Sequence, residues 1–93
     1  MLKISVIETK TELRWILEGQ LAVPWVMELR ESWKSKQRSR KGRACIVDLN
    51  DVVSVDAAGE DLLRDLLKRG AQLVGTPLYL RYLLQRLKAG EQA

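Results

Sequence analysis

Apolar and polar residues alternate along the first part of the chain. Apolar side chains recur at every second position over residues 2–6 and again over residues 13–17, and the polar segment Thr9–Glu12 separates the two stretches. A period of two residues is typical of strands with one buried face. The pattern therefore predicts two strands joined as an antiparallel pair, and we expect Gly19 to end the second strand.

A helical period follows the strand pair. Val26, Leu29 and Trp33 are spaced by three and four residues, so they form one apolar stripe on a helix. Pro24 has a fixed φ and no N–H group, which suits the first turn of a helix. We expect this helix to run from Pro24 to about Lys34.

The next segments repeat the order of strand and helix. The apolar run Ala44–Leu49, closed by polar residues at 48–51, predicts a central strand with both faces covered. A second helix is expected over about residues 57–69, with Gly70 as its C-terminal cap. A short strand over residues 71–74 follows it.

The end of the chain predicts a last helix. Thr76 and Pro77 have the N-cap and first-turn chemistry of a helix start, and leucines follow at positions 80, 83, 84 and 87. The predicted order is ββαβαβα. This is an α/β fold, a single layer of helices packed against a mixed four-stranded sheet, in one domain that spans residues 1–93.

Composition limits the chemistry of the chain. It contains no histidine, which excludes serine–histidine and cysteine–histidine catalysis, and Cys45 is the only thiol, placed inside an apolar run. Turn and cap roles account for Asp48, Asp51 and Asp56, so no metal site is predicted. No apolar run approaches the roughly 20 residues that span a bilayer. We therefore expect a cytoplasmic protein that is not an enzyme, takes no cofactor and does not insert into a membrane.

One short stretch stands out at the start of the second helix. Asp56 is placed to cap this helix, and Ala57, Ala58 and Gly59 then occupy its first positions, where backbone N–H groups lack partners. Small side chains leave those groups open to a docking partner. The alternative interpretation is that they only let the helix pack closely on the sheet.

The surrounding motifs resemble those of a known family. Residues 46–49 (IVDL) followed by residues 55–59 (VDAAG) are similar to the signature of the STAS family, the sulfate transporter and anti-sigma-factor-antagonist domains. Residues 15–21 (WILEGQL) resemble the second strand of that family, and the predicted element order agrees with its core. The resemblance implies a protein-docking module whose contacts involve Asp56, Ala57, Ala58, Gly59, Glu60 and Leu63.

Two departures from the family pattern change the expected regulation. The resemblance places Ala58 where the antagonists carry a serine that a partner kinase phosphorylates, and Ala57 before it also lacks a hydroxyl. Glu60 and Asp61 stand where the family has leucine and a small residue. These acids either imitate the phosphorylated form or simply complement the helix dipole.

The resemblance implies two classes of protein partner. One is a kinase-like anti-sigma factor, and the other is the ATPase of an ABC-type lipid transporter, to which a domain of this type would be an accessory subunit. The sequence does not separate these alternatives, and it leaves a homodimer and nucleotide binding open.

A basic segment gives a third alternative. Residues 34–43 hold six cations, more than the net charge of +4 for the whole chain. Such a segment either binds an anion or is a solvated connection between a helix and a strand. No aromatic residue is interleaved with the cations, which disfavours a nucleic-acid platform. The candidate anion-binding residues are Lys36, Arg38, Arg40, Lys41 and Arg43.

Overall fold

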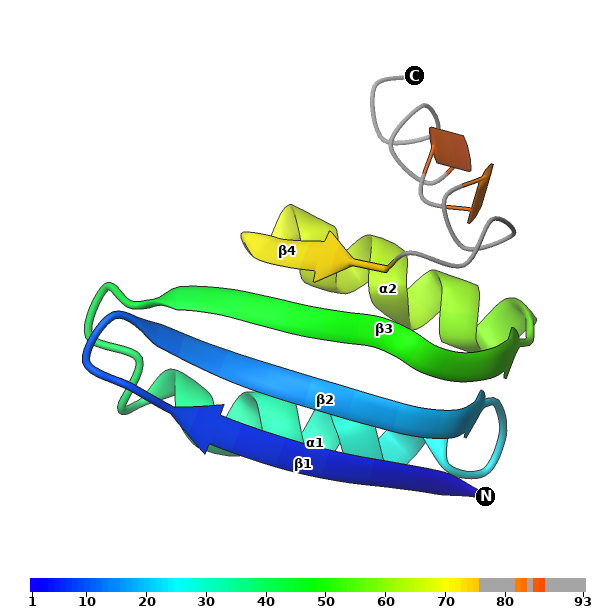
Figure 1. Ribbon diagram of the computed structural model, residues 1–93, viewed down its shortest axis with the longest axis horizontal. Coiled ribbons are helices and arrows are strands. Elements are labelled where there is room, and N and C mark those ends of the chain that lie inside the picture. Colours follow the sequence, from blue (N-terminus) through cyan, green and yellow to red (C-terminus); the bar gives the residue numbers. More distant parts are fainter. Residues whose placement is uncertain (76–81, 84, 87–93) are drawn as a thin grey trace.

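A four-stranded mixed sheet with two helices forms the fold of the computed structural model, which describes residues 1–75, 82, 83, 85 and 86 (Figure 1). The elements are β1 (Leu2–Glu8), β2 (Glu12–Leu21), α1 (Val26–Gln37), β3 (Ala44–Val55), α2 (Ala57–Lys68) and β4 (Ala71–Val74). The strands lie in the order β1-β2-β3-β4. β1 is antiparallel to β2, whereas β2, β3 and β4 run parallel. The predicted α/β class and strand pairing are confirmed.

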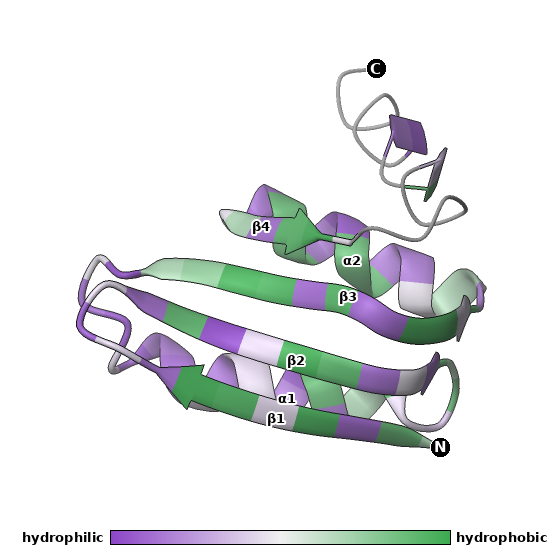
Figure 2. Cartoon of the chain, viewed as in Figure 1, coloured by the Kyte–Doolittle hydropathy of each residue, from purple (hydrophilic) through white to green (hydrophobic). Residues whose placement is uncertain are grey.

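The core lies between the sheet and the two helices. Figure 1 shows α1 behind β1 and β2, and α2 behind β3 and β4, so one face of the sheet carries both helices. Every second residue of β2 and β3 is buried over most of their length. Figure 2 shows polar and apolar residues interspersed along β2, whereas the first part of β3 is continuously apolar. The buried apolar residues are Leu2, Leu13, Trp15, Leu17, Leu21, Val26, Leu29, Trp33, Cys45, Val47, Leu49, Val52, Leu62, Leu63, Leu66, Ala71, Leu73 and Leu83.

Two strands are longer than the sequence predicts. β2 does not end at Gly19, which adopts a φ of +108° inside the strand, and the strand continues to Leu21. β3 passes through the polar residues expected to close it and ends at Val55. The β2–β3 register shifts twice in this region, as extra residues on β3 are accommodated by bulges. The bulges restore inward-facing positions for Val52, so the strand remains paired beyond the polar cluster.

The ends of α1 also differ from expectation. The helix begins at Val26, because residues 23–25 form a turn that contains Pro24, and it extends to Gln37. The first cations of the basic segment therefore lie on a helix and not in a loop. The three residues of the predicted apolar stripe are all buried, as expected.

The helix predicted from Thr76 falls mostly outside the described residues. Of its four leucines, Leu83 is described and is buried. By contrast, α2 begins at Ala57, as the sequence predicts. Gly70 follows the end of this helix with a left-handed φ of +94°, as expected of a C-terminal cap. Cys45 is also buried as predicted, and this burial raises the pKa of its thiol.

A tryptophan pair joins the centre of the sheet to α1. The rings of Trp15 and Trp33 lie 5.0 Å apart between centroids and are tilted by 35°. Trp15 has no exposed surface, and its indole N–H donates to the Ser32 hydroxyl at 2.9 Å. The hydroxyl satisfies the only polar group of an otherwise apolar side chain.

Replacing Ser32 by alanine should destabilise the fold by about 1–3 kcal/mol, because the buried indole N–H then loses its partner. Equilibrium denaturation followed by tryptophan fluorescence measures this free energy. Ser35→Ala is the matched control, since the Ser35 hydroxyl is exposed and bonds to the carbonyl of Ser32 on the same helix. Equal stability of the two variants would show that the indole bond contributes little.

Candidate docking site

The Asp56 carboxylate joins two segments at one end of the sheet. Its Oδ1 accepts the backbone N–H of Gly59 at 2.7 Å and so caps α2, as the sequence predicts. Its Oδ2 accepts the backbone N–H of Val23 at 3.0 Å, in the connection between β2 and α1. The N–H of Val23, followed by that of Gly59, lowers the pKa of this carboxyl. The aspartate therefore holds the β2–α1 connection against the start of α2.

Gly59 is required by close packing. A Cβ atom at this position would lie 2.3 Å from the carbonyl oxygen of Leu21, a backbone atom that has little freedom to move. The same oxygen accepts the N–H of Asp56 at 3.2 Å. For Gly59, the structure thus supports the packing interpretation of the small residues.

Ala57 and Ala58 are the first two residues of α2, and they differ in exposure. Ala57 is exposed, whereas Ala58 is half-buried and packs in part against the core. Exposed apolar side chains come from the other segments that reach this end of the molecule: Val23, Met27 and Val53 expose 64%, 55% and 68% of their surface. We call these five residues the α2-start surface.

The sequence interpretation missed three members of this surface. Met27 lies off the apolar stripe of α1, so the helical period could have predicted its exposure. Val23 lies in a turn, and the neighbouring proline could have predicted its exposure in the same way. The exposure of Val53 could not be predicted from the sequence, because the bulges of β3 change which positions of the strand face inward and outward.

Two other predicted docking residues have different roles. Leu63 has no exposed surface and belongs to the core, so it offers no contact area to a partner. Glu60 is paired with Arg86, with 3.0 Å between the charged groups, and Asp61 with Arg64 at 3.1 Å. Because both carboxylates have cationic partners within the chain, their position favours local ion pairing and dipole complementation over imitation of a phosphate.

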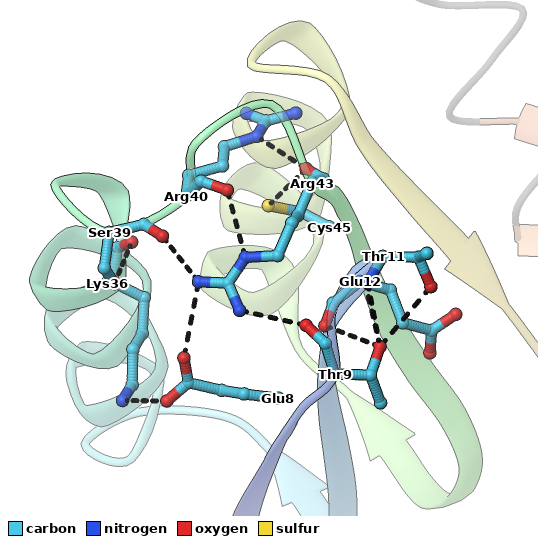
Figure 3. A network of polar contacts seen from close by, with 9 residues as sticks. All are labelled: Glu8, Thr9, Thr11, Glu12, Lys36, Ser39, Arg40, Arg43 and Cys45. Atoms are coloured by element: carbon cyan, nitrogen blue, oxygen red, sulfur yellow. Dashed lines mark hydrogen bonds and ion pairs between the residues drawn. The ribbon is translucent and has the colours of Figure 1, made fainter.

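The cations of the basic segment differ in their surroundings, and Figure 3 shows those that are bonded within the chain. Glu8 of β1 accepts from Lys36 at 2.8 Å and from Arg43 at 3.4 Å. The hydrogen bond from Lys36 is the main cause of the lowered pKa of Glu8. Arg43 also donates to the carbonyl of Thr9 at 3.0 Å and to that of Ser39.

Arg40 completes this arrangement by donating to the carbonyl of Arg43 at 3.1 Å and to that of Arg69 at 3.3 Å. Three of the five candidate anion-binding residues therefore fix the α1–β3 connection to β1 and to the end of α2. The side chains of Arg38 and Lys41 are exposed. The segment differs from the solvated connection that its sequence suggests, because backbone carbonyls and Glu8 orient its arginines.

The carboxylates of the described residues are dispersed or locally bonded. Within the described part of the chain, no group of three or more histidine, cysteine, aspartate or glutamate side chains is placed to hold a metal ion. Asp48 instead accepts from Arg14 at 3.1 Å and from the Asn50 N–H at 3.0 Å. Among the same residues, no helix has the length and apolar character needed to cross a bilayer.

Comparison with solved structures identifies the fold. No family model matches the sequence, and no curated protein matches it either. An anti-sigma factor antagonist from Mycobacterium paratuberculosis superposes with a TM-score of 0.82 at 12% identity, covering 99% of this chain and 82% of that one. Unphosphorylated SpoIIAA, also an anti-sigma factor antagonist, gives 0.71 at 16% identity, with coverages of 89% and 82%. An uncharacterized protein from Shewanella loihica with a SpoIIAA-like fold gives 0.60 at 12%, with coverages of 87% and 71%. The chain has the SpoIIAA-like fold, as the resemblance to the STAS family implies.

Gly59→Ala should destabilise the protein by about 1–3 kcal/mol, since the added methyl group forces α2 away from the Leu21 carbonyl. Chemical denaturation measures the change. Ala57→Ser serves as the control, because it adds one atom at the exposed neighbouring position. A Gly59→Ala variant as stable as the parent would contradict the close contact.

Asp56→Asn should lower the thermal unfolding midpoint, because an amide has one oxygen to serve two N–H donors and its NH₂ group faces the second donor. The folded-state pKa of Asp56 is lowered, so its stabilisation is present above the unfolded pKa of about 3.9 and is lost as the pH falls through the lower folded value. Thermal scans should show a constant difference between the two proteins near neutral pH and a shrinking one below about pH 4. A difference that stays unchanged down to pH 2 would exclude the carboxylate as its source.

Proposed function

We propose that this protein is a non-catalytic regulatory module that docks another protein through its α2-start surface. The observation that carries the proposal is the pair of alanines at the start of α2, Ala57 exposed and Ala58 half-buried, on a fold shared with two anti-sigma factor antagonists. Asp56 and Gly59 have architectural roles, so Ala57 and Ala58 are the residues of the motif that face a partner.

The two alanines define how this docking is regulated. A phosphoserine carries about −1.5 to −2 charges at neutral pH and would introduce them directly into such an interface. Alanine has no hydroxyl to receive a phosphoryl group. The module therefore binds its partner constitutively and is not switched off by phosphorylation at this position.

Exposed apolar residues supply the driving force for the interaction. Val23 lies in the connection that Asp56 holds against the start of α2, and Met27 and Val53 add exposed apolar side chains on α1 and β3. Their burial by a partner would remove apolar surface from water. The partner that this surface fits is a kinase-like anti-sigma factor with a complementary apolar face. The lone buried cysteine agrees with action in the cytoplasm.

Ala57→Asp and Ala58→Asp should each weaken partner binding at least tenfold, since they place an unpaired carboxylate in an apolar contact. Ala57→Asp should fold, because its position is exposed and an acidic residue in a first helical turn complements the helix dipole. Circular dichroism checks the fold of Ala58→Asp, whose position is half-buried. Affinity capture from native lysate with mass spectrometry identifies the partner, and titration of the purified partner measures the affinity. Gln72→Asp is the matched control, as it adds the same charge at an exposed position on β4.

The identity of the captured protein decides between the classes of function. Recovery of a kinase-like anti-sigma factor, with loss on either alanine substitution and retention by the β4 control, is the expected result. An ABC transporter ATPase recovered with the same pattern would make the protein a transport accessory. Equal capture by all versions would remove the α2-start surface from the interface.

A further inference from the structure

β1 forms an open edge of the sheet. It is the outermost strand on its side, and none of the residues that the structure describes pairs with its outer edge. Its seven residues pair with β2 without a register shift. Natural edge strands are commonly protected by proline, a bulge or a central charge. β1 has no proline, and its charged residues, Lys3 and Glu8, lie near its ends.

Two backbone hydrogen bonds establish which groups of β1 point outward. The N–H of Gln20 donates to the carbonyl of Met1 at 3.0 Å, and the N–H of Thr9 donates to the carbonyl of Glu12 at 2.9 Å. Bonded and non-bonded residues alternate in an antiparallel pair, so the odd-numbered residues from 1 to 9 exchange bonds with β2. The N–H and C=O groups of the even-numbered residues therefore turn toward the open edge.

The side chains of the same even-numbered residues are partly apolar. They lie on the helix face of the sheet, where Leu2 is buried but Ile4 and Val6 remain half-buried at the edge of the core. Apolar side chains and unpaired backbone groups thus occupy the same edge. On the opposite face, Ile7 exposes 49% of its surface, and Figure 2 shows the apolar character of this end of the strand.

We propose that β1 pairs antiparallel with β1 of a second copy, so that the two sheets form one continuous sheet of eight strands. A two-fold axis perpendicular to the sheet keeps all the helices on one face, and it therefore pairs even-numbered residues with even-numbered ones. When the axis passes at Ser5, the whole strand is paired. Ile4 then lies beside Val6 of the second copy on the helix face, and each completes the apolar cover of the other.

This register is also compatible with the charges of β1. It places Lys3 opposite Ile7 of the second copy and Glu8 opposite Leu2, so no like charges face each other. Moving the axis to Val6 would leave the first two residues of β1 without partners in the strand, and moving it to Ile4 would leave the last two without partners. The axis at Ser5 therefore gives the longest ladder, because it pairs all seven residues of β1.

The dimer does not depend on the proposed docking function. β1 forms one edge of the sheet, whereas α2 covers β3 and β4 toward the other edge. The α2-start surface of each copy stays open, so the assembly presents two docking surfaces. Failure of the dimer would leave the docking proposal intact, and the reverse also holds.

Cysteine cross-linking tests the register directly. Ser5 faces Ser5 of the second copy as a non-hydrogen-bonded pair with about 4.5 Å between Cα atoms, a separation that a disulfide spans. Under mild oxidation, Ser5→Cys should form a covalent dimer on a non-reducing gel. Lys3→Cys is the control, because its two copies would lie roughly 13 Å apart along the strands. Native Cys45 has no exposed surface and does not compete.

Light scattering after size exclusion measures the oligomeric state of the unmodified chain. A dimer mass at high concentration is expected. Val6→Pro should make the protein monomeric, because it removes an outward N–H that the sheet of a single copy does not use, and far-UV circular dichroism reports whether it folds. A monomer mass at all concentrations, equal cross-linking of the Ser5→Cys and Lys3→Cys variants, or a folded Val6→Pro dimer would each overturn the proposal.

Discussion

The backbone carbonyl of Leu21 is the point on which the arrangement of this end of the molecule depends. It accepts the N–H of Asp56 and lies directly against Gly59, so the end of β2 and the start of α2 approach at backbone distance. Asp56 then spans from α2 to the β2–α1 connection. The two contacts together determine where α2 begins, and hence which residues face solvent at its first turn.

This constraint separates architecture from function within one short motif. A carboxylate at 56 and the absence of a Cβ at 59 are physical requirements of the junction. Ala57 satisfies no such requirement because it is exposed, and Ala58 is half-buried and packs only in part against the core. Packing constrains these two positions less than it constrains positions 56 and 59, and the proposed regulation rests on their lack of a hydroxyl group.

The basic segment shows a related division between alternate cations. Lys36, Arg40 and Arg43 are partly buried and bonded to Glu8 or to backbone carbonyls, while Arg38 and Lys41 are exposed. Guanidinium groups are suited to this task, because each carries several donors in one plane and can satisfy carbonyls from separate segments. Much of the local charge thus serves to close the α1–β3 connection on the end of the β1–β2 pair.

Hydrophobic periodicity alone determined the element types, the antiparallel first pair and the helix stripes, because each depends on neighbours within a few residues in the chain. The cap at Asp56 and the left-handed Gly70 could likewise be predicted from the sequence, since both are local backbone requirements. The tertiary structure decided the rest. The bulges that carry β3 past its polar cluster arise from pairing with β2, which lies some thirty residues earlier. The burial of Leu63, the need for glycine at 59 and the bonding of the basic segment to Glu8 depend on contacts between distant segments, and a local pattern contains no measure of those distances.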